Sequence, residues 1–302
     1  MDLKQLDYFV HVAELGSFTK AASLLAVAQP ALSRQVRQLE VELKHTLLYR
    51  NGRGVSVTEA GKRLVAHARG ILQQVERARG ELEDIKGAPV GRVVVGVPPS
   101  VGRMLTVPLV TAFRARYPGA SLGMVEGLSV TIQEWLLTGR VDVGLIYNPV
   151  PAPAVEITPF LEEELFLIRP AEGNEAKAVK ALPLRDLPDF PLIIPSRPHA
   201  IRMYVETQLA KLRLKPTVAL EIDGVSSILD LVHEGHGCAV LSLNAVLGHK
   251  RRFSATPFAR PRLTSHLTLA VSAQRPTTPL TRSSFELIQR IGPQLLIKAL
   301  PR

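Results

Sequence analysis

The chain has 302 residues, of which 46% are hydrophobic and 21% are charged, and its formal net charge is +10. This length is enough for two or three domains with buried cores, and the hydrophobic share excludes a wholly disordered protein. The single cysteine, Cys238, excludes an intramolecular disulfide and a cysteine-based zinc site. The sequence has no apolar run of the ~18 residues that a membrane span needs, and its charged start lacks the pattern of a signal peptide. We therefore expect a cytoplasmic protein with no membrane partner.

The positive charge favours a polyanionic partner, and part of it is concentrated early in the chain. Between Gln29 and Arg63, seven basic residues accompany only three acidic ones, Glu40, Glu42 and Glu59. Such a segment is either a nucleic-acid contact or an ordinary solvated surface. The predicted secondary structure around it favours one of these readings.

Apolar residues at helical spacing predict a first helix over residues 3–13, and Gly16 marks its end. Ser17 can cap a short second helix over Phe18–Leu25. Pro30 fits the first turn of a third helix, because its missing N–H costs nothing there. The inner stripe of this third helix is formed by Leu32, Val36, Leu39 and Leu43. Two helices joined by a short turn are typical of a helix-turn-helix motif.

The opposite face of the third helix is polar and basic. It carries Gln29, Ser33, Arg34 and Arg37, whose side chains can hydrogen-bond base edges or phosphates. Asn51-Gly52 and Gly54 then predict a tight turn between short extended segments, which places Arg50 and Arg53 on a wing. An arginine at the tip of a wing can enter a narrow minor groove. DNA binding is therefore a better interpretation than a solvated helix face.

These residues resemble the LysR-type transcriptional regulators over about 60 contiguous positions. The matching motifs are Leu6–Phe9, Gly16–Ala22, Gln29–Val36, Leu39–Glu40, Leu47–Leu48 and Thr58–Gly61. Within the family, Gly91–Ser100 and Pro191–His199 look most like regulators of the nitrogen-assimilation-control type. The resemblance implies a winged helix-turn-helix whose third helix enters the major groove. It also implies that Gln29, Pro30, Ser33, Arg34 and Arg37 meet DNA, with Arg53 on the wing, whereas Phe9 and Leu32 are core residues.

A long helix is predicted after Thr58, which can cap it, and it can continue to Lys86 without a proline. Its apolar residues alternate at steps of four and three, and they are Leu64, Ala68, Ile71, Val75, Ala78, Leu82 and Ile85. This heptad seam favours dimerisation, although a helix packed on its own domain would show a similar stripe. The family resemblance implies the same linker helix, with dimers paired into tetramers.

The rest of the chain alternates apolar extended runs with helical segments, which is typical of an α/β sheet. The family resemblance adds two lobes like those of periplasmic binding proteins, with a ligand cleft between them. The expected domains are 1–58 for DNA binding, 59–87 for the linker and dimerisation helix, and 88–302 for effector binding. Lobe I spans about 91–160 and 267–302, and lobe II about 161–266. The prolines of Pro149–Pro153 suggest where the chain first crosses.

Ligands of open α/β sheets lie beyond the carboxyl ends of strands, near helix N-termini. This rule selects Ser100, Ser129, Tyr147, Ser196 and His199. Small hydroxyl groups and free helix N–H groups suit a small anionic effector. Each serine could instead be a plain helix cap. The sequence departs from the family pattern at Ser242, where proline is common, and at Ala200, where nitrogen-type regulators tend to carry glycine.

A catalytic role is not expected, because the sequence has no nucleotide-binding loop, nucleophile elbow or dinucleotide fingerprint. His233, Glu234, His236 and Cys238 cluster, but glycines break the helical spacing that a metal site would need. We expect no metal and no cofactor. The predicted function is a regulator that binds double-stranded promoter DNA, responds to an effector and contacts RNA polymerase. The alternative is a small-molecule sensor with only nonspecific DNA affinity.

Overall fold

The computed structural model describes residues 1–51, 54–84, 90–171, 180–246, 252–259 and 262–297. The chain divides into two compact units. The N-terminal unit comprises residues 1–92 with Thr138–Arg140, and the C-terminal unit comprises residues 93–137 and 141–302. No helix among the described residues is long and apolar enough to cross a membrane.

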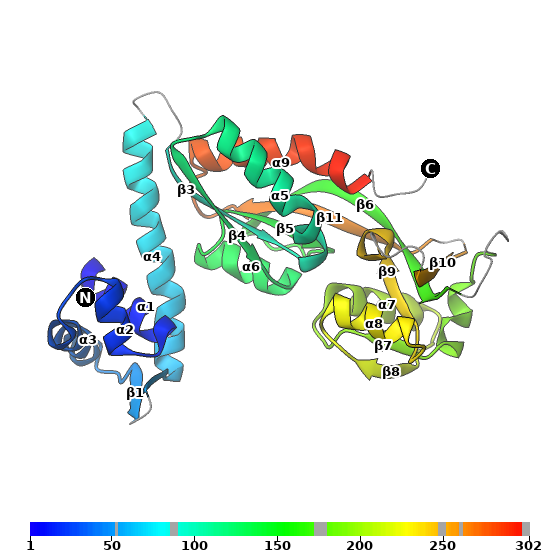
Figure 1. The fold of residues 1–302 in the computed structure, drawn as a ribbon, viewed down its shortest axis with the longest axis horizontal. Helices are drawn as coiled ribbons and strands as arrows, with labels where there is room; N and C mark the ends of the chain where they lie inside the picture. The colour runs from blue at the N-terminus through cyan, green and yellow to red at the C-terminus, as the bar shows by residue number, and fades with distance from the viewer. Residues whose placement is uncertain (52–53, 85–89, 172–179, 247–251, 260–261, 298–302) are drawn as a thin grey trace. The chain divides into compact units, whose positions relative to one another are not determined.

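The N-terminal unit is a three-helix domain with a β-hairpin and a long following helix (Figure 1). Its elements are α1 (Leu3–Leu15), α2 (Phe18–Leu24), α3 (Gln29–Leu43), β1 (Leu48–Asn51), β2 (Gly54–Val57) and α4 (Glu59–Asp84). The helix ends follow local signals: Gly16 ends α1 in the left-handed region at φ 59°, and the Ser17 side chain accepts a hydrogen bond from the Lys20 amide. Phe9 and Leu32 are completely buried, as the sequence predicts.

The heptad-seam residues in the first half of α4 pack into the core of the N-terminal unit. Ala68 is fully buried, and Leu64 and Leu72 pack against the same core as α1 and α3. Farther along α4, Ile71 is 40% exposed and Ala78 is exposed. The side chain of Leu82 and residue Ile85 lie outside the described residues. The helix therefore packs on its own domain first and leaves the later seam positions open.

The C-terminal unit is built on a mixed sheet in the order β10-β6-β11-β5-β3-β4, with β9 also paired to β6. Its strands are β3 (Gly91–Val97), β4 (Ala120–Glu126), β5 (Val143–Tyr147), β6 (Val155–Pro170), β9 (Ala239–Ser242), β10 (Phe253–Pro257) and β11 (Thr264–Ser272). Side chains alternate between two cores: Val93 and Val95 face α5 (Pro99–Arg116) and α9 (Pro279–Ile297), whereas Val94 faces α6 (Ser129–Thr138). Figure 1 shows α5 and α9 on one face of the sheet and α6 on the other.

A second group of elements surrounds the far half of β6. It contains η1 (Leu184–Asp189), β7 (Leu192–Ile194), α7 (Ala200–Lys211), β8 (Val218–Glu221), α8 (Val225–His233) and η2 (Leu243–Val246). Strands β7 and β8 pair in parallel, and Leu192 bridges to Cys238 just before β9. Two hydrophobic cores pack against these strands, and helix α7 contributes to one of them while helix α8 contributes to the other. The unit thus has the two lobes that the family resemblance implies.

The first crossing between the lobes lies within β6 and not at Pro149–Pro153. Residues 155–164 of β6 pair with β11, and residues 165–170 pair with β9 and β10. The prolines at 149–153 precede β6 and only turn the chain back into the first sheet. The sequence misleads here because a proline-rich run reads as a break between lobes, whereas pairing with β11 begins directly after it, at Val155.

Candidate functional site

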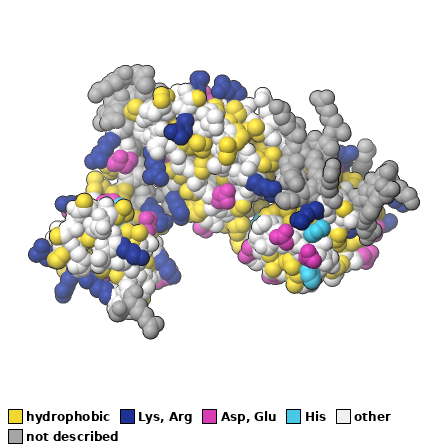
Figure 2. All heavy atoms as spheres, in the orientation of Figure 1, with side chains coloured by type: hydrophobic (Ala, Val, Ile, Leu, Met, Phe, Trp, Pro, Cys, Tyr) yellow, Lys and Arg dark blue, Asp and Glu magenta, His cyan; other side chains and the backbone are white. Residues whose placement is uncertain are grey.

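The outer face of α3 presents most of the predicted DNA-contacting side chains to solvent. Gln29, Pro30, Arg34 and Arg37 are exposed, whereas Leu32, Val36 and Leu39 are fully buried on the inner face. The helix starts at Gln29 with Pro30 in its first turn. Figure 2 shows several Lys and Arg side chains on the visible surface of the N-terminal unit, which contains α3. An exposed basic helix above an apolar core has the geometry that fits a DNA groove.

A hydrogen bond between Ser33 and Arg50 links α3 to the hairpin. The Arg50 Nη1 atom donates a hydrogen bond to Ser33 Oγ at 3.0 Å, and the guanidinium lies 4.4 Å from the centroid of the Phe18 ring. These contacts hold the Arg50 side chain against the protein surface. Arg53, the predicted wing residue, lies outside the described residues.

Two polar side chains, those of the half-buried Glu40 and the buried Thr58, position the hairpin beside α3. Glu40 Oε1 accepts hydrogen bonds from the Leu47 and Leu48 amides at 2.8 and 3.1 Å. Thr58 Oγ1 donates to the Thr46 carbonyl at 2.8 Å and accepts from the Gly61 amide at 3.0 Å. The predicted cap of the long helix is therefore present. The sequence pointed to Thr58 through its predicted capping role, whereas no sequence pattern pointed to Glu40.

A cavity of about 280 Å³ lies within the C-terminal unit, and four helices begin at its wall. The first turns or preceding residues of α5, α6, α7 and α8 line it through Ser100, Ser129, Ala200 and Val225. Helix N-termini carry unpaired N–H groups and the positive end of the helix dipole. Their convergence makes the cavity suited to an anionic group.

The cavity brings together four of the five predicted effector-binding residues: Ser100, Ser129, Tyr147 and His199. Ser100 lies in the first turn of α5, because Pro98 and Pro99 start the helix ahead of it. Ser129 Oγ accepts a hydrogen bond from the Tyr147 amide at 3.0 Å. Ser196 does not line the cavity: its amide and hydroxyl both donate to Asp223, which does line it.

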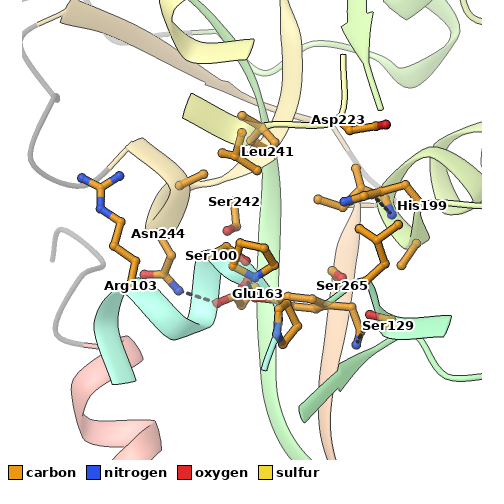
Figure 3. Close-up of a pocket in the computed structure, with 18 of the residues that line it drawn as sticks. Ser100, Arg103, Ser129, Glu163, His199, Asp223, Leu241, Ser242, Asn244 and Ser265 are labelled. Carbon is orange, nitrogen blue, oxygen red and sulfur yellow. Dashed lines mark hydrogen bonds between the residues drawn. The ribbon is translucent and has the colours of Figure 1, made fainter. Parts of the chain in front are cut away.

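Glu163 and Asn244 form a buried polar corner of the cavity (Figure 3). The Tyr147 hydroxyl donates to Glu163 Oε2 at 2.9 Å, and the Asn244 amide donates to Glu163 Oε1. Burial, together with the charge of Glu163, raises the pKa of Tyr147 well above its usual value of 10.0. Tyr147 is therefore a neutral hydrogen-bond donor at ordinary pH.

His199 caps α7 beside the cavity. Its Nδ1 atom accepts a hydrogen bond from the Ile201 amide at 3.3 Å, which requires that nitrogen to be unprotonated. Burial lowers the pKa of His199 below 6.5, although Asp223 partly opposes this effect. The hydrogen bonds from Ser196 lower the pKa of Asp223. The pair therefore contributes a neutral imidazole and a carboxylate to the cavity wall.

Some cavity residues follow the same strand-end rule that selected the predicted ones. Asp223 comes two residues after β8, and Asn244 comes two residues after β9, so the rule could have found both. Glu163 lies inside β6 and carries no such signal. Arg103, one turn beyond Ser100 on α5, also lines the cavity.

The described residues contain no group of three or more His, Cys, Asp or Glu side chains placed to hold a metal ion. Cys238 is buried, and this burial raises the pKa of its thiol. A thiol in that state is a poor nucleophile at neutral pH. The cluster around His233 therefore offers little for catalysis.

Two family models match the chain over most of its length. The model described as "LysR substrate binding domain" matches residues 86–292. The model described as "Bacterial regulatory helix-turn-helix protein, lysR family" matches residues 3–62. The second match contains α1–α3 and the hairpin, and the first contains the cavity.

Curated relatives cover nearly the whole chain. The nitrogen assimilation regulatory protein nac of Escherichia coli (strain K12) is 32% identical over 299 residues, which is 96% of this chain and 95% of the relative. A probable RuBisCO transcriptional regulator of Cyanophora paradoxa is 33% identical over 250 residues, covering 81% and 77% of the two chains. These relatives are named as regulators and not as enzymes.

Solved structures share the architecture. Full-length OxyR from Pseudomonas aeruginosa, a variant form, aligns with a TM-score of 0.71 at 26% identity, covering 98% of this chain and 95% of that chain. The LysR family regulator CbnR aligns with a TM-score of 0.72 at 23% identity, covering 96% and 99%. Motifs, family models, relatives and fold agree over most of the sequence. The chain therefore belongs to the LysR family of transcriptional regulators, with a helix-turn-helix domain followed by a substrate-binding domain.

Proposed function

We propose that this regulator binds promoter DNA through α3 and the hairpin, and that a small anionic effector in the C-terminal cavity modulates the binding. The observation that carries the proposal is the convergence of four helix N-termini, with Ser100 and Ser129, on one cavity in a chain that begins with a helix-turn-helix domain. The cavity volume of about 280 Å³ suits a metabolite of a few heavy atoms.

On the DNA side, the proposal assigns base or phosphate contacts to Gln29, Pro30, Ser33, Arg34 and Arg37, with Arg50 and Arg53 on the hairpin. The exposure of Arg34 and Arg37 supports this assignment. Arg50 supports it indirectly, since its hydrogen bond to Ser33 links hairpin and helix. Side chains of this kind both position a helix on the backbone and read bases.

An effector can change regulation only if it binds two conformations of the protein with different affinities. We propose that effector binding alters the arrangement of a homodimer or homotetramer on double-stranded DNA in the cytoplasm, and so alters DNA bending and contact with RNA polymerase. Two-fold related helix-turn-helix domains read two half-sites, which supports an oligomer.

The direct test is fluorescence anisotropy of the full chain on DNA from upstream of its own gene, compared with scrambled DNA, across a salt series. We expect a preference of ~10³ or more for the upstream DNA that persists as salt increases. Equal and steeply salt-dependent binding to both DNAs would favour the alternative function, a small-molecule sensor with nonspecific DNA affinity.

A further inference from the structure

Glu163 places a buried negative charge in the cavity wall. Its side chain is 5% exposed, and its two oxygens accept hydrogen bonds from Tyr147 and Asn244, which are both neutral donors. Among the residues that the structure describes, no Lys, Arg or His forms an ion pair with Glu163. Within the part of the chain that the structure describes, this carboxylate therefore has no cationic partner.

A buried carboxylate that lacks a cation is unfavourable, because neutral hydrogen bonds replace only part of its lost hydration. Glu163 borders a cavity, so a ligand can supply a positive charge that the described residues do not. The most suitable group is an ammonium, which has three donors and no acceptor. A second acid group placed against Glu163 would be repelled.

Asn244 adds to the excess of acceptors at this corner. Its amide nitrogen must be the atom that faces Glu163, because a carboxylate can only accept hydrogen bonds. Figure 3 shows this nitrogen directed toward Glu163. The amide oxygen is buried and accepts no hydrogen bond in the described part of the chain. The Ser242 hydroxyl, at a position where the family pattern has proline, lines the same cavity.

Among the described residues that line the cavity, the acidic Glu163 and Asp223 outnumber the basic Arg103. His199 adds no positive charge at neutral pH, because its pKa is lowered. The helix N-termini nevertheless favour an acid group. Tyr147 connects the two regions, because its hydroxyl contacts both Ser100, in the first turn of α5, and Glu163. One small molecule can therefore meet both regions if it carries opposite charges close together.

We propose that the effector is a small amino acid, whose carboxylate lies at the helix N-termini and whose ammonium group lies against Glu163. This inference rests on the proposed effector-binding function and narrows the ligand from an anion to a zwitterion. It predicts that an acid lacking the amino group binds much more weakly than its amino acid.

Isothermal titration calorimetry of the full chain with matched pairs of compounds tests this inference. The pairs are l-alanine and propionate, l-aspartate and succinate, l-leucine and 4-methylpentanoate, and l-phenylalanine and 3-phenylpropanoate. We expect at least one amino acid to bind about tenfold or more tightly than its partner, since a charge-assisted hydrogen bond to a buried carboxylate carries that preference.

The Glu163→Gln substitution should remove most of this preference and leave the apparent melting temperature unchanged or higher. Its matched control is Glu164→Gln on the same strand, where the carboxylate pairs with Arg262 outside the cavity. The control should keep the tenfold preference. A purely structural role for Glu163 would instead lower the melting temperature and leave the preference intact.

Equal or tighter binding of the plain carboxylates would overturn the inference while leaving an anionic effector in place. Failure of every amino acid in the panel to bind would also count against it. Both results come from the unmodified chain, so they hold even if Glu163→Gln does not fold. Promoter preference is measured separately by anisotropy, so failure of the proposed DNA-binding function would be recognised independently.

Discussion

Arg34 and Arg37 point to solvent from α3, whereas Arg50 is held by Ser33 and Phe18. The arginines of the binding face therefore differ in whether their guanidinium groups already contact the protein. An arginine held on the protein mainly maintains the shape of the binding face, because its donors are partly used. A free arginine can reach a purine edge with two hydrogen bonds.

We therefore expect Arg34→Ala to cost about 1–3 kcal/mol on upstream promoter DNA and much less on scrambled DNA. The measurement is anisotropy at constant salt. Arg282→Ala, which removes an exposed arginine from α9, is the control and should change neither affinity. Equal losses on both DNAs would make Arg34 a phosphate contact without a role in base reading.

His199 gives a pH dependence with a defined sign. Its pKa is lowered in the folded chain, so between the folded value and 6.5 the unfolded state binds the proton that the folded state does not. The contribution of neutral His199 to the stability of the C-terminal unit is therefore fully present above pH 6.5, and it is lost as the pH falls through 6.5 toward the folded pKa. Protonation of Nδ1 would also break its hydrogen bond from Ile201.

The substitution His199→Asn keeps a side chain that can cap α7 and removes the titration. We expect it to reduce the loss of stability between pH 7.5 and pH 5.5. Urea unfolding followed by the fluorescence of Trp135, the single tryptophan of the sequence, measures this effect in the C-terminal unit. The exposed His236 provides the control His236→Asn. An unchanged pH slope in His199→Asn would contradict the prediction.

At the scale of elements, Thr58 connects the hairpin to α4. Its hydroxyl is buried, and it makes two hydrogen bonds to backbone groups on different segments. Thr58→Val keeps the shape of the side chain but leaves both backbone groups without this partner. The expected cost is about 1–3 kcal/mol.

Hydrogen–deuterium exchange of peptides covering residues 46–62 measures the local effect. Thr58→Val should speed exchange there by about tenfold or more. The control is Thr111→Val on α5, where an exposed hydroxyl bonds to the Val107 carbonyl within one helix. Unchanged exchange in the Thr58 variant would mean that the hairpin is held by other contacts, such as those of Glu40.

Helix ends with local signals and apolar strands could be predicted from the sequence, whereas the pairing of the strands and the extent of some of them could not. Gly16, Ser17 and Thr58 mark helix ends through contacts within a few residues. Strand β10 was not predicted, because its hydrogen bonds come from β6, more than eighty residues earlier. The same holds for the residues of the cavity. Ser100 and Tyr147 could be predicted because they lie at strand ends, whereas Glu163 lies in the middle of β6 and reaches the cavity because this strand crosses between the lobes.

At the scale of the whole molecule, the remaining seam of α4 is the predicted oligomer contact. Leu64 and Ala68 are used within the N-terminal unit, so the dimer must rely on later positions such as Ile71 and Val75. Ile71 is 40% exposed in the single chain. An apolar side chain left exposed on a long helix is typical of a helix–helix interface.

We expect Ile71→Asp to lower the mass of the protein measured by light scattering, because a charge in the seam would lose its hydration on association. The control Lys62→Asp changes the exposed face of α4, where Lys62 pairs with Glu59. An unaltered mass in Ile71→Asp would place the subunit interface elsewhere on the chain.

The continuity of β6 limits how this protein can be divided experimentally. A fragment ending at residue 160, or one comprising only residues 161–266, would cut a strand that supplies hydrogen bonds to both lobes. Each fragment would expose an unpaired strand edge, which promotes aggregation. Limited proteolysis, truncation or expression of single lobes should therefore yield insoluble material, whereas cuts near residue 88 keep every strand of the C-terminal unit whole.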